Sequence, residues 1–358
     1  MRLEKIRALM RNENLDAVIV TDPKNRRYFS GFSGSAGMLA ITVESQQVFT
    51  DFRYFEQVKI EAPDYDLVEL ESALVIYESL VRAIKENGVG KGGRIGFEGG
   101  YVIFNVYKKL AEFFPDNELV PISLDGCRMV KDEEELRLIK KAAAIADEAF
   151  NQVLVHIKPG VREIDVALEL EYFMRKLGAE KPAFDTIVAS GHRGALPHGM
   201  ASSKVLEEGD LVTIDFGAVY QGYHSDMTRT VALGKSDAKQ REIYSIVLEA
   251  QLTGLGALTA GKTGKEVDAA AREVIEKRGY GKYFGHGLGH SVGLAIHELP
   301  SLSPKSEIKL EPGVVVSVEP GIYIPDWGGV RIEDLVLVLP DGKEILTTSA
   351  KQLIEINI

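Results

Sequence analysis

Three apolar segments in the second half of the chain have the composition of buried β-strands, yet each contains a carboxylate. These acids are Asp215 in residues 211–217, Glu319 in residues 313–321 and Glu333 in residues 330–338. Val and Ile favour strands, and a buried carboxylate is costly unless a cation or another partner neutralises it. The sequence therefore predicts a fold that brings these acids to a common partner, for which a metal ion is the simplest candidate.

A fourth acid, Asp226, follows Asp215 across the sequence Gly-Ala-Val-Tyr-Gln-Gly, which is typical of a hairpin. The hairpin would return Asp226 to the neighbourhood of Asp215. Four clustered carboxylates repel one another and raise each other's pKa, whereas two divalent cations would balance four negative charges. We therefore expect two divalent metal ions per subunit. Because side chains alternate along a strand, Arg331 is expected on the same face as Glu333.

Histidines accompany these acids in loops that contain glycine or proline. They are His198, His286, His290 and His297. An isolated histidine is more often a packed core residue, but this grouping favours a functional role; His192 and His224 stay open. His286 and His290 enclose Gly-Leu-Gly, which is poor helix material, so a glycine-lined loop is expected rather than a zinc-protease helix. With His290 as an imidazole ligand, this mostly oxygen set suits Mn²⁺, Co²⁺, Fe²⁺ or Zn²⁺ better than Ca²⁺.

The first part of the chain alternates short strands and helices. Strands are expected at 16–20, 37–42, 47–50, 67–70 and 94–97, and helices near 53–61, 73–87 and 102–114. This pattern predicts an α/β domain over residues 1–125, followed by a second domain over 126–358. No Gly-x-Gly-x-x-Gly motif opens a helix after the first strand, which gives no reason to expect a dinucleotide. The glycine-rich stretch 29–37 is expected to be a tight loop.

The second domain contains an internal repetition. After a charged helix expected near 132–156, similar sequences at 162–167 and 265–270 each open a helix that ends at a glycine. A segment rich in glycine and histidine follows each helix. The nearly constant spacing suggests a duplicated helix-plus-strand unit with a site between its two halves, although two amphipathic helices can resemble each other by chance.

The composition argues against several classes of partner. The net charge of −11 is opposite to that of a typical nucleic-acid-binding protein. The first residues have helical periodicity rather than a signal-peptide core, and no stretch approaches a membrane span. Cys127, the single cysteine, is expected to be a packing residue. We therefore expect a cytoplasmic protein that has neither a nucleic acid nor a membrane as its partner.

The ordered motifs of the second domain resemble the pita-bread metallopeptidase family, which includes aminopeptidase P, prolidase, methionine aminopeptidase and creatinase. The blocks are Asp215, the hairpin to Asp226 in 225–230, residues 286–290, residues 318–321 and residues 329–334. The resemblance extends from about residue 130 to the end, and the α/β domain before it is similar to that of the proline-specific branch. It implies a creatinase-type α/β domain, an α+β pita-bread catalytic domain with pseudo-twofold halves, and metal-dependent hydrolysis.

The resemblance also implies roles for individual residues. Asp215 would bind one metal, Asp226 and Glu333 would bridge both, and His290 and Glu319 would bind the other. His198 and His297 would contact the substrate around the scissile amide, and His286, Tyr323 and Arg331 would line the pocket near the proline. A hydroxide between the metals would attack, Glu319 would move the proton, and His297 would stabilise the oxyanion. Mn²⁺ or Co²⁺ is expected, with Zn²⁺ or Fe²⁺ as alternatives.

Three functions fit this resemblance, and an aminopeptidase without proline specificity is a further alternative. Residues 28–37 and 49–54 look like the first-domain pattern of aminopeptidase P, so the first hypothesis is an Xaa-Pro aminopeptidase that acts on small peptides with proline in second position. An Xaa-Pro dipeptidase, or prolidase, would share the whole metal set. A homologue that binds peptides or a partner without hydrolysis is the third. Members of the branch are commonly homodimers, which makes a homodimer the expected assembly.

Overall fold

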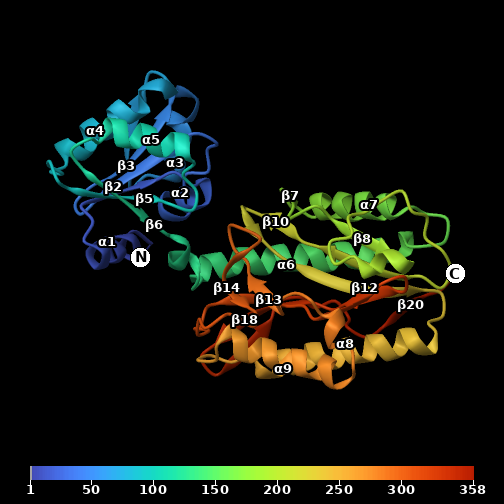
Figure 1. Cartoon of the computed structure of the whole chain (residues 1–358). Coiled ribbons are helices and arrows are strands. Elements are labelled where there is room, and N and C mark those ends of the chain that lie inside the picture. The colour runs from blue at the N-terminus through green and yellow to red at the C-terminus, as the bar shows by residue number, and fades with distance from the viewer. Residues whose placement is uncertain (1) are drawn as a thin grey trace. The chain divides into compact units, whose positions relative to one another are not determined.

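The computed structural model describes residues 2–358, which form two compact units divided between Arg128 and Met129 (Figure 1). Each unit has its own hydrophobic core. In the described part of the chain, no helix is both long and apolar enough to cross a membrane.

The first unit is built around a six-stranded sheet in the order β4-β3-β2-β1-β5-β6. Its strands are β1 (Ala17–Val20), β2 (Met38–Thr42), β3 (Gln46–Asp51), β4 (Asp66–Leu70), β5 (Arg94–Glu98) and β6 (Glu118–Ile122). Its α-helices are α1 (Arg2–Glu13), α2 (Pro23–Ser30), α3 (Phe55–Glu61), α4 (Ile76–Glu86) and α5 (Phe104–Phe113). β1 is buried throughout and pairs antiparallel with β2 and parallel with β5.

The five strands and three helices expected in the first unit are all present, but α2 and β6 were not predicted. α2 occupies the beginning of the glycine-rich stretch that was expected to be a loop. Asp22 caps it by accepting a hydrogen bond from the backbone of Lys24, and Gly31 ends it at a φ of 86°, which favours glycine. Only the rest of the stretch, up to Gly37, is a loop. The loop prediction therefore holds for residues 31–37, and only Phe29 and Ser30 belong to the helix instead.

The second unit consists of two halves, each with a pair of helices packed against a sheet. The helices are α6 (Glu133–Val153), α7 (Glu163–Lys176), α8 (Ala238–Ala257) and α9 (Gly264–Lys277). The first sheet contains β8 (Ile187–Ser190), β9 (Leu211–Phe216), β12 (Met227–Leu233) and β20 (Ile354–Ile356). The second contains β13 (Gly289–Ser291), β14 (Glu298–Leu302), β15 (Val315–Val318), β18 (Asp334–Leu339) and β19 (Gly342–Ile345).

Short elements complete both units. The remaining strands are β7 (Lys181–Pro182), β10 (Ala218–Tyr220), β11 (Tyr223–His224), β16 (Gly321–Ile324) and β17 (Gly328–Arg331). The 3₁₀ turns are Phe52–Tyr54, Ala73–Val75, Asp125–Arg128, Leu154–His156, Gly191–Ala195 and Gly281–Tyr283.

The two halves of the second unit place their helices on opposite sides of the strands (Figure 1). The first core cluster joins α6 and α7 to β8, β9 and β12, and the second joins α8 and α9 mainly to β15 and β18. This arrangement agrees with the duplicated helix-plus-strand unit expected from the sequence. It also leaves the strands of the two halves facing a common interior.

The hairpin between Asp215 and Asp226 is present. β9 and β12 are antiparallel, with Asp215 opposite Thr228, so Asp226 lies just before the start of β12 and close to Asp215. Gly217 permits this close pairing, since a Cβ there would lie 1.9 Å from the carbonyl oxygen of Ser225.

Glu319 and Glu333 were expected at strand ends or on strand faces, and both lie at strand ends. Glu319 directly follows β15, and Glu333 lies in a two-residue break between β17 and β18. These two strands belong to different sheets, since β17 pairs with β16 whereas β18 pairs with β15 and β19. Both strands are buried, and aliphatic residues lie on either side of the break, so the sequence pattern does not reveal the change of sheet. Strand alternation therefore does not explain why Arg331 and Glu333 face the same region.

Candidate metal centre

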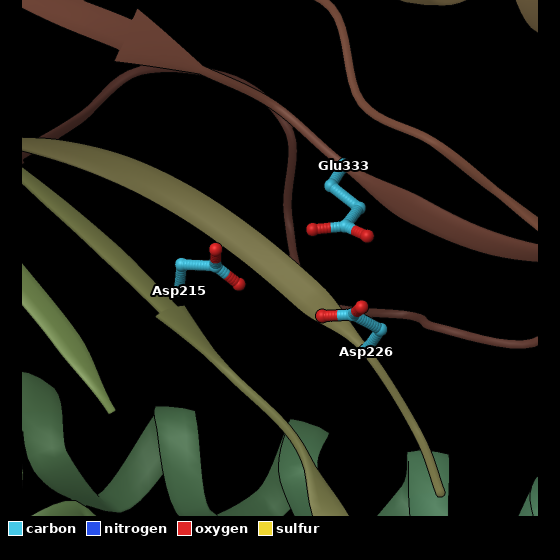
Figure 2. A group of neighbouring side chains, drawn as sticks. All are labelled: Asp215, Asp226 and Glu333. Carbon is cyan, nitrogen blue, oxygen red and sulfur yellow. The ribbon is translucent and has the colours of Figure 1, made fainter. Parts of the chain in front are cut away.

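Three carboxylates converge in the interior of the second unit. Asp215 comes from β9, Asp226 from the start of β12, and Glu333 from the break between β17 and β18. One oxygen of each lies within 4.8 Å of an oxygen of the others, and Figure 2 shows the three groups directed at a common space. Segments from both halves of the unit therefore supply one acidic cluster.

His290 and Glu319 extend this cluster on the side of the second half. The Nε2 atom of His290 lies 3.6 Å from Oδ2 of Asp226 and 3.4 Å from Oε1 of Glu319. Its Nδ1 lies 3.2 Å from the carbonyl oxygen of Ser291, which can only accept, so Nδ1 carries the proton. Nε2 consequently presents its lone pair to the acids, as a histidine ligand of a metal does.

The backbone around His290 requires glycine. A Cβ at Gly289 would lie 2.0 Å from the carbonyl oxygen of Ser317, so only glycine allows this close approach. The hydroxyl of Ser317 accepts a hydrogen bond from the backbone of His290 at 3.0 Å and donates one to Glu319 at 3.0 Å. Ser317 thus fixes both members of this side of the cluster.

Four acids are buried close together, and among the residues that line the cavity Arg331 is the arginine that pairs with one of them. Burial, followed by repulsion from neighbouring acids, raises the pKa of Asp226 and Glu333 well above the ordinary values, and burial also raises the pKa of Glu319. Burial lowers the pKa of His290, which favours its neutral, ligating form. Two buried oxygens, Oδ1 of Asp215 and Oε1 of Glu333, have no hydrogen-bond partner. Divalent cations would satisfy these orphaned oxygens and offset the repulsion, so the residues fit a metal centre.

A chain of polar contacts forms one wall beside the cluster. Arg331 donates to Oδ2 of Asp215 at 2.7 Å and to the hydroxyl of Tyr323 at 2.9 Å. The Tyr323 hydroxyl also lies 2.9 Å from Nε2 of His286, whose Nδ1 faces the carbonyl oxygen of Gly287 at 2.7 Å. Nδ1 therefore carries the proton, and Nε2 accepts from the tyrosine. Burial raises the pKa of Tyr323 to about 12, so its hydroxyl stays protonated at neutral pH.

All ten residues predicted for the site line one cavity of about 560 Å³. The two histidines not yet placed, His198 and His297, lie in this lining, and the His297 ring is 4.3 Å from the His290 ring between centroids. Burial lowers the pKa of His297. Two other histidines lie elsewhere: His224 is buried, with Nδ1 3.0 Å from the carbonyl oxygen of Gly293, and His192 lies in a 3₁₀ turn.

Several residues of the site were missed in the sequence. The cavity is also lined by Phe184, Asp185, Ile187, Pro197, Met200, Ile296, Ser301 and Ser303. Thr228 was missed as well, although it donates to Oε2 of Glu333 at 2.7 Å and accepts from Nε of Arg331 at 3.0 Å. Its position two residues after Asp226 in the predicted hairpin could have identified it, since that hairpin brings it opposite Asp215. The apolar residues carry no such signal.

Two family models match this chain. Residues 137–340 match the metallopeptidase family M24, and residues 2–130 match the creatinase/prolidase N-terminal domain. The chain belongs to metallopeptidase family M24. Its first unit is thus a creatinase-type domain and its second is the pita-bread domain, as the sequence predicted.

Individual relatives cover nearly the whole chain. An Xaa-Pro dipeptidase from Pyrococcus furiosus is 43% identical over 356 residues, with 99% of both proteins covered. The structure of an Xaa-Pro dipeptidase from Bacillus anthracis has a TM-score of 0.95 and 47% identity, covering 99% of this chain and 98% of that one. An X-Pro aminopeptidase from Thermotoga maritima has a TM-score of 0.90 and 40% identity, with 99% of both chains covered.

Membership in this family makes the protein a metallopeptidase of a dinuclear-metal-dependent group, and the acidic cluster is compatible with such a centre. The identity of the ions, the homodimer and the cytoplasmic location remain predictions from the sequence.

Proposed function

We propose that this M24 metallopeptidase is an Xaa-Pro dipeptidase that uses two divalent ions. The observation that carries the proposal is the buried cluster of Asp215, Asp226 and Glu333 inside a cavity, in a chain 42–43% identical to proteins named Xaa-Pro dipeptidase over 99% of its length. The sequence alone placed the aminopeptidase first. These relatives reverse that order and make the dipeptidase the leading proposal.

The metal ions would be held by the five predicted ligands. They are Asp215, Asp226, His290, Glu319 and Glu333. When bound, divalent ions lower the pKa of water and polarise a carbonyl oxygen. Glu319 is suited to carry a proton from the attacking water to the leaving nitrogen, because burial raises its pKa towards the working range and Ser317 fixes its orientation.

The histidines and the polar wall would position the peptide. His297 is neutral at pH 7, because burial lowers its pKa, and it can donate a hydrogen bond to the oxygen that becomes negative. His198 lines the same cavity and can bind the amide from another side. His286, Tyr323 and Arg331 satisfy one another, so this wall can face a proline ring, which has no N–H to donate.

A second candidate is the Xaa-Pro aminopeptidase, and one feature of the cavity favours it. A dipeptide substrate carries a free carboxylate next to the proline ring, which is best bound by a cation. Within the described part of the chain, Arg331 is the single arginine in the cavity lining, no lysine lines the cavity, and Arg331 already pairs with Asp215 at 2.7 Å. A peptide that continues beyond proline would place a neutral amide there instead.

A hydrolysis panel separates these functions. Protein treated with chelator and reloaded with Mn²⁺ or Co²⁺ would be offered Ala-Pro, Ala-Pro-Ala and Met-Ala-Ala. The dipeptidase proposal predicts cleavage of Ala-Pro alone, whereas release of alanine from Ala-Pro-Ala would establish the aminopeptidase. Cleavage of Met-Ala-Ala would point to an aminopeptidase without proline specificity. Absence of turnover with every substrate and both metals would leave the peptide-binding homologue.

A further inference from the structure

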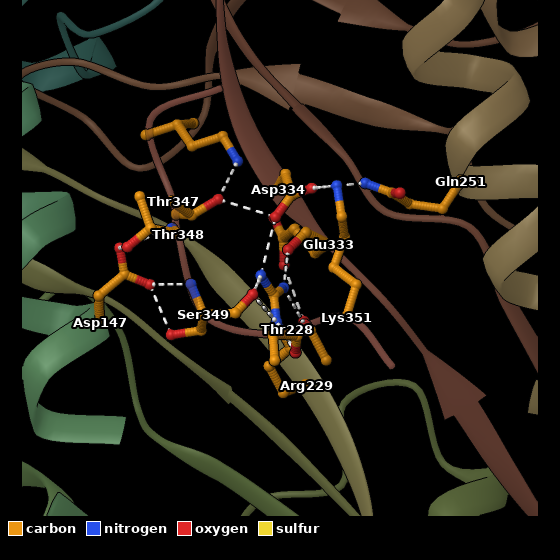
Figure 3. A network of polar contacts seen from close by, with 12 residues as sticks. Asp147, Thr228, Arg229, Gln251, Glu333, Asp334, Thr347, Thr348, Ser349 and Lys351 are labelled. Atoms are coloured by element: carbon orange, nitrogen blue, oxygen red, sulfur yellow. Dashed lines mark hydrogen bonds and ion pairs between the residues drawn. The ribbon is translucent and has the colours of Figure 1, made fainter. Parts of the chain in front are cut away.

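A buried polar network surrounds the backbone of Glu333 and Asp334 (Figure 3). At its centre is Asp334, whose side chain is fully buried. Oδ1 of Asp334 accepts from Arg229 at 2.8 Å and from Thr347 at 2.9 Å, and Oδ2 accepts from Lys351 at 2.6 Å and from Gln251 at 2.8 Å. We call these five residues the Asp334 network. None of them lines the cavity, so none is placed to touch the substrate.

Within this network, Arg229 connects three segments of the chain. It extends from β12 and donates to the carbonyl oxygen of Ser349 at 2.7 Å, to Asp334, and to the backbone carbonyl oxygen of Glu333. Its side chain is 1% exposed, so these bonds are shielded from water. Lysine could not reproduce them, because the planar guanidinium directs several donors at once.

These contacts hold the backbone of Glu333 against β12. The backbone N–H of Glu333 donates to the carbonyl oxygen of Thr228 at 3.1 Å, its carbonyl accepts from Arg229, and its side chain accepts from the Thr228 hydroxyl at 2.7 Å. Asp226 is two residues before Thr228 and directly precedes β12. The separation between the carboxylates of Asp226 and Glu333 is therefore set through residues 228 and 229.

The charges of the network explain why it needs a buried acid. Arg229 and Lys351 bring two positive charges close to the break between β17 and β18, and Asp334 is the carboxylate that pairs with both. Removing the charge of Asp334 would leave Arg229 and Lys351 without their shared carboxylate in a buried environment, which is strongly unfavourable. The break would then relax, and Glu333 would move with it.

We propose that Arg229 and Asp334 are positioning residues that hold Glu333 at bridging distance from Asp226 and so set the affinity for the second metal ion. The inference rests on the dinuclear centre of the proposed function. It concerns the backbone of a metal ligand rather than the ligand's own carboxylate. Outer residues that orient metal ligands typically change metal affinity by about 10- to 100-fold.

The test is a calorimetric titration of chelated protein with Mn²⁺, without peptide, at a temperature where circular dichroism shows each variant folded. Asp334→Asn and Arg229→Lys should each weaken the binding of one of the two ions by about 10- to 100-fold. The double variant Arg229→Gln with Asp334→Asn removes both charges, avoids an unpaired Arg229, and should show the same loss. It keeps the test decisive where a single variant unfolds.

A matched control is available in Asp147 on α6. This buried carboxylate also accepts four hydrogen bonds, all from Thr348 and Ser349, and none from Arg229. It is linked to Arg229 through Ser349, whose carbonyl oxygen accepts from Arg229, and not through the backbone of Glu333. Asp147→Asn should lower the melting temperature while leaving both Mn²⁺ affinities within about twofold of wild type.

Three outcomes would overturn the inference. The first is a double variant that binds both Mn²⁺ ions with wild-type affinity. The second is an equal loss of Mn²⁺ affinity in Asp334→Asn and Asp147→Asn. The third is a wild-type protein that binds fewer than two Mn²⁺ ions. Because the titration contains no peptide, it is independent of the proposed specificity. A wild-type protein that binds two ions but cleaves no Xaa-Pro peptide would refute the proposed function and leave this inference standing.

Discussion

The two halves of the second unit secure their loops with buried acids, but they use different residues to do so. In the first half, Glu163 at the start of α7 accepts hydrogen bonds from Arg193, Ser190 and Ser202, which hold the segment that carries His198. In the second half, Asp268 on α9 pairs with Arg272 of the same helix and accepts from the backbone of Leu288. Arg272 then donates to carbonyl oxygens of the following segment, including that of His286.

The difference shows that the repeated sequence and the repeated structure are not in the same register. The similar sequences align Glu163 with Glu266, yet α7 and α9 both have 14 residues and begin at Glu163 and Gly264. In the structure, Glu266 corresponds to Asp165, and each of these acids occupies the third position of its helix, where it accepts from the backbone that caps the helix. The two halves therefore share the order of their elements, but each anchors its loop with a different acid.

The largest effect on turnover is expected from removing Asp226, a carboxylate of the cluster to which both halves contribute. Asp226→Ala should reduce turnover by about 10³-fold, because loss of several kcal/mol of metal-derived stabilisation corresponds to roughly three powers of ten. The fold should remain, since removal of one acid relieves repulsion in the metal-free protein. Activity assays, Mn²⁺ stoichiometry and circular dichroism would measure this, and unchanged activity would remove Asp226 from the centre.

Neutralising each of the two anchoring acids, Glu163 and Asp268, tests the difference between the halves directly. Glu163→Gln and Asp268→Asn remove charges from carboxylates whose arginine partners are both 19% exposed, so the two ion pairs are matched. Glu163→Gln should destabilise more, by about 1–2 kcal/mol, because Glu163 also accepts from both Ser190 and Ser202.

The functional effects of these two variants should also differ. Asp268→Asn should weaken Mn²⁺ binding, because Leu288 precedes His290 by two residues, whereas Glu163→Gln should lower turnover with unchanged Mn²⁺ affinity. Urea unfolding and calorimetry would measure both. Identical profiles for the two variants would contradict the idea that the halves anchor different functions.

Stability should fall with rising pH in the chelated protein and rise with pH in the Mn²⁺-loaded protein. Burial raises the pKa of Asp226, Glu319 and Glu333 above the ordinary values of 3.8 and 4.5, so these groups bind protons more tightly in the folded state. Chelated protein should therefore lose stability as the pH rises from about 4 towards neutral, because the unfolded state releases its protons first. With Mn²⁺ the melting temperature should instead rise over the same range, because deprotonated carboxylates bind the ion. Parallel melting curves with and without metal would contradict this.

The smallest effect concerns how the two helices begin. Thr263 caps α9 by accepting from the backbone of Glu266, whereas Arg162 occupies the same position of α7 and its side chain makes no capping bond. Thr263→Ala should cost about 1 kcal/mol of unfolding free energy, and Arg162→Thr should stabilise by about 0.5 kcal/mol. Thermal unfolding would detect both, and an Arg162→Thr variant less stable than wild type would show that the halves are capped by different rules.

The sequence determined the chemistry of the site because its signals are local. A carboxylate in an apolar segment is conspicuous wherever it lies, so Asp215, Glu319 and Glu333 could be selected from sequence alone. The same reasoning predicted five strands of the first unit from their composition. It did not predict α2, which begins with Asp-Pro just before the glycine-rich stretch, and it missed β6, which carries Pro121.

The tertiary structure decided how those residues are held, because long-range contacts leave no mark on local composition. The break before Asp334 has no glycine or proline to mark it in the sequence, and both flanking strands are buried in different sheets. Arg229 and Asp334 are 105 positions apart, and nothing in either segment indicates that their charges meet. The sequence thus determines which carboxylates and histidine are available to bind metal. Their geometry depends on packing between the two halves of the second unit, which no single segment of the sequence specifies.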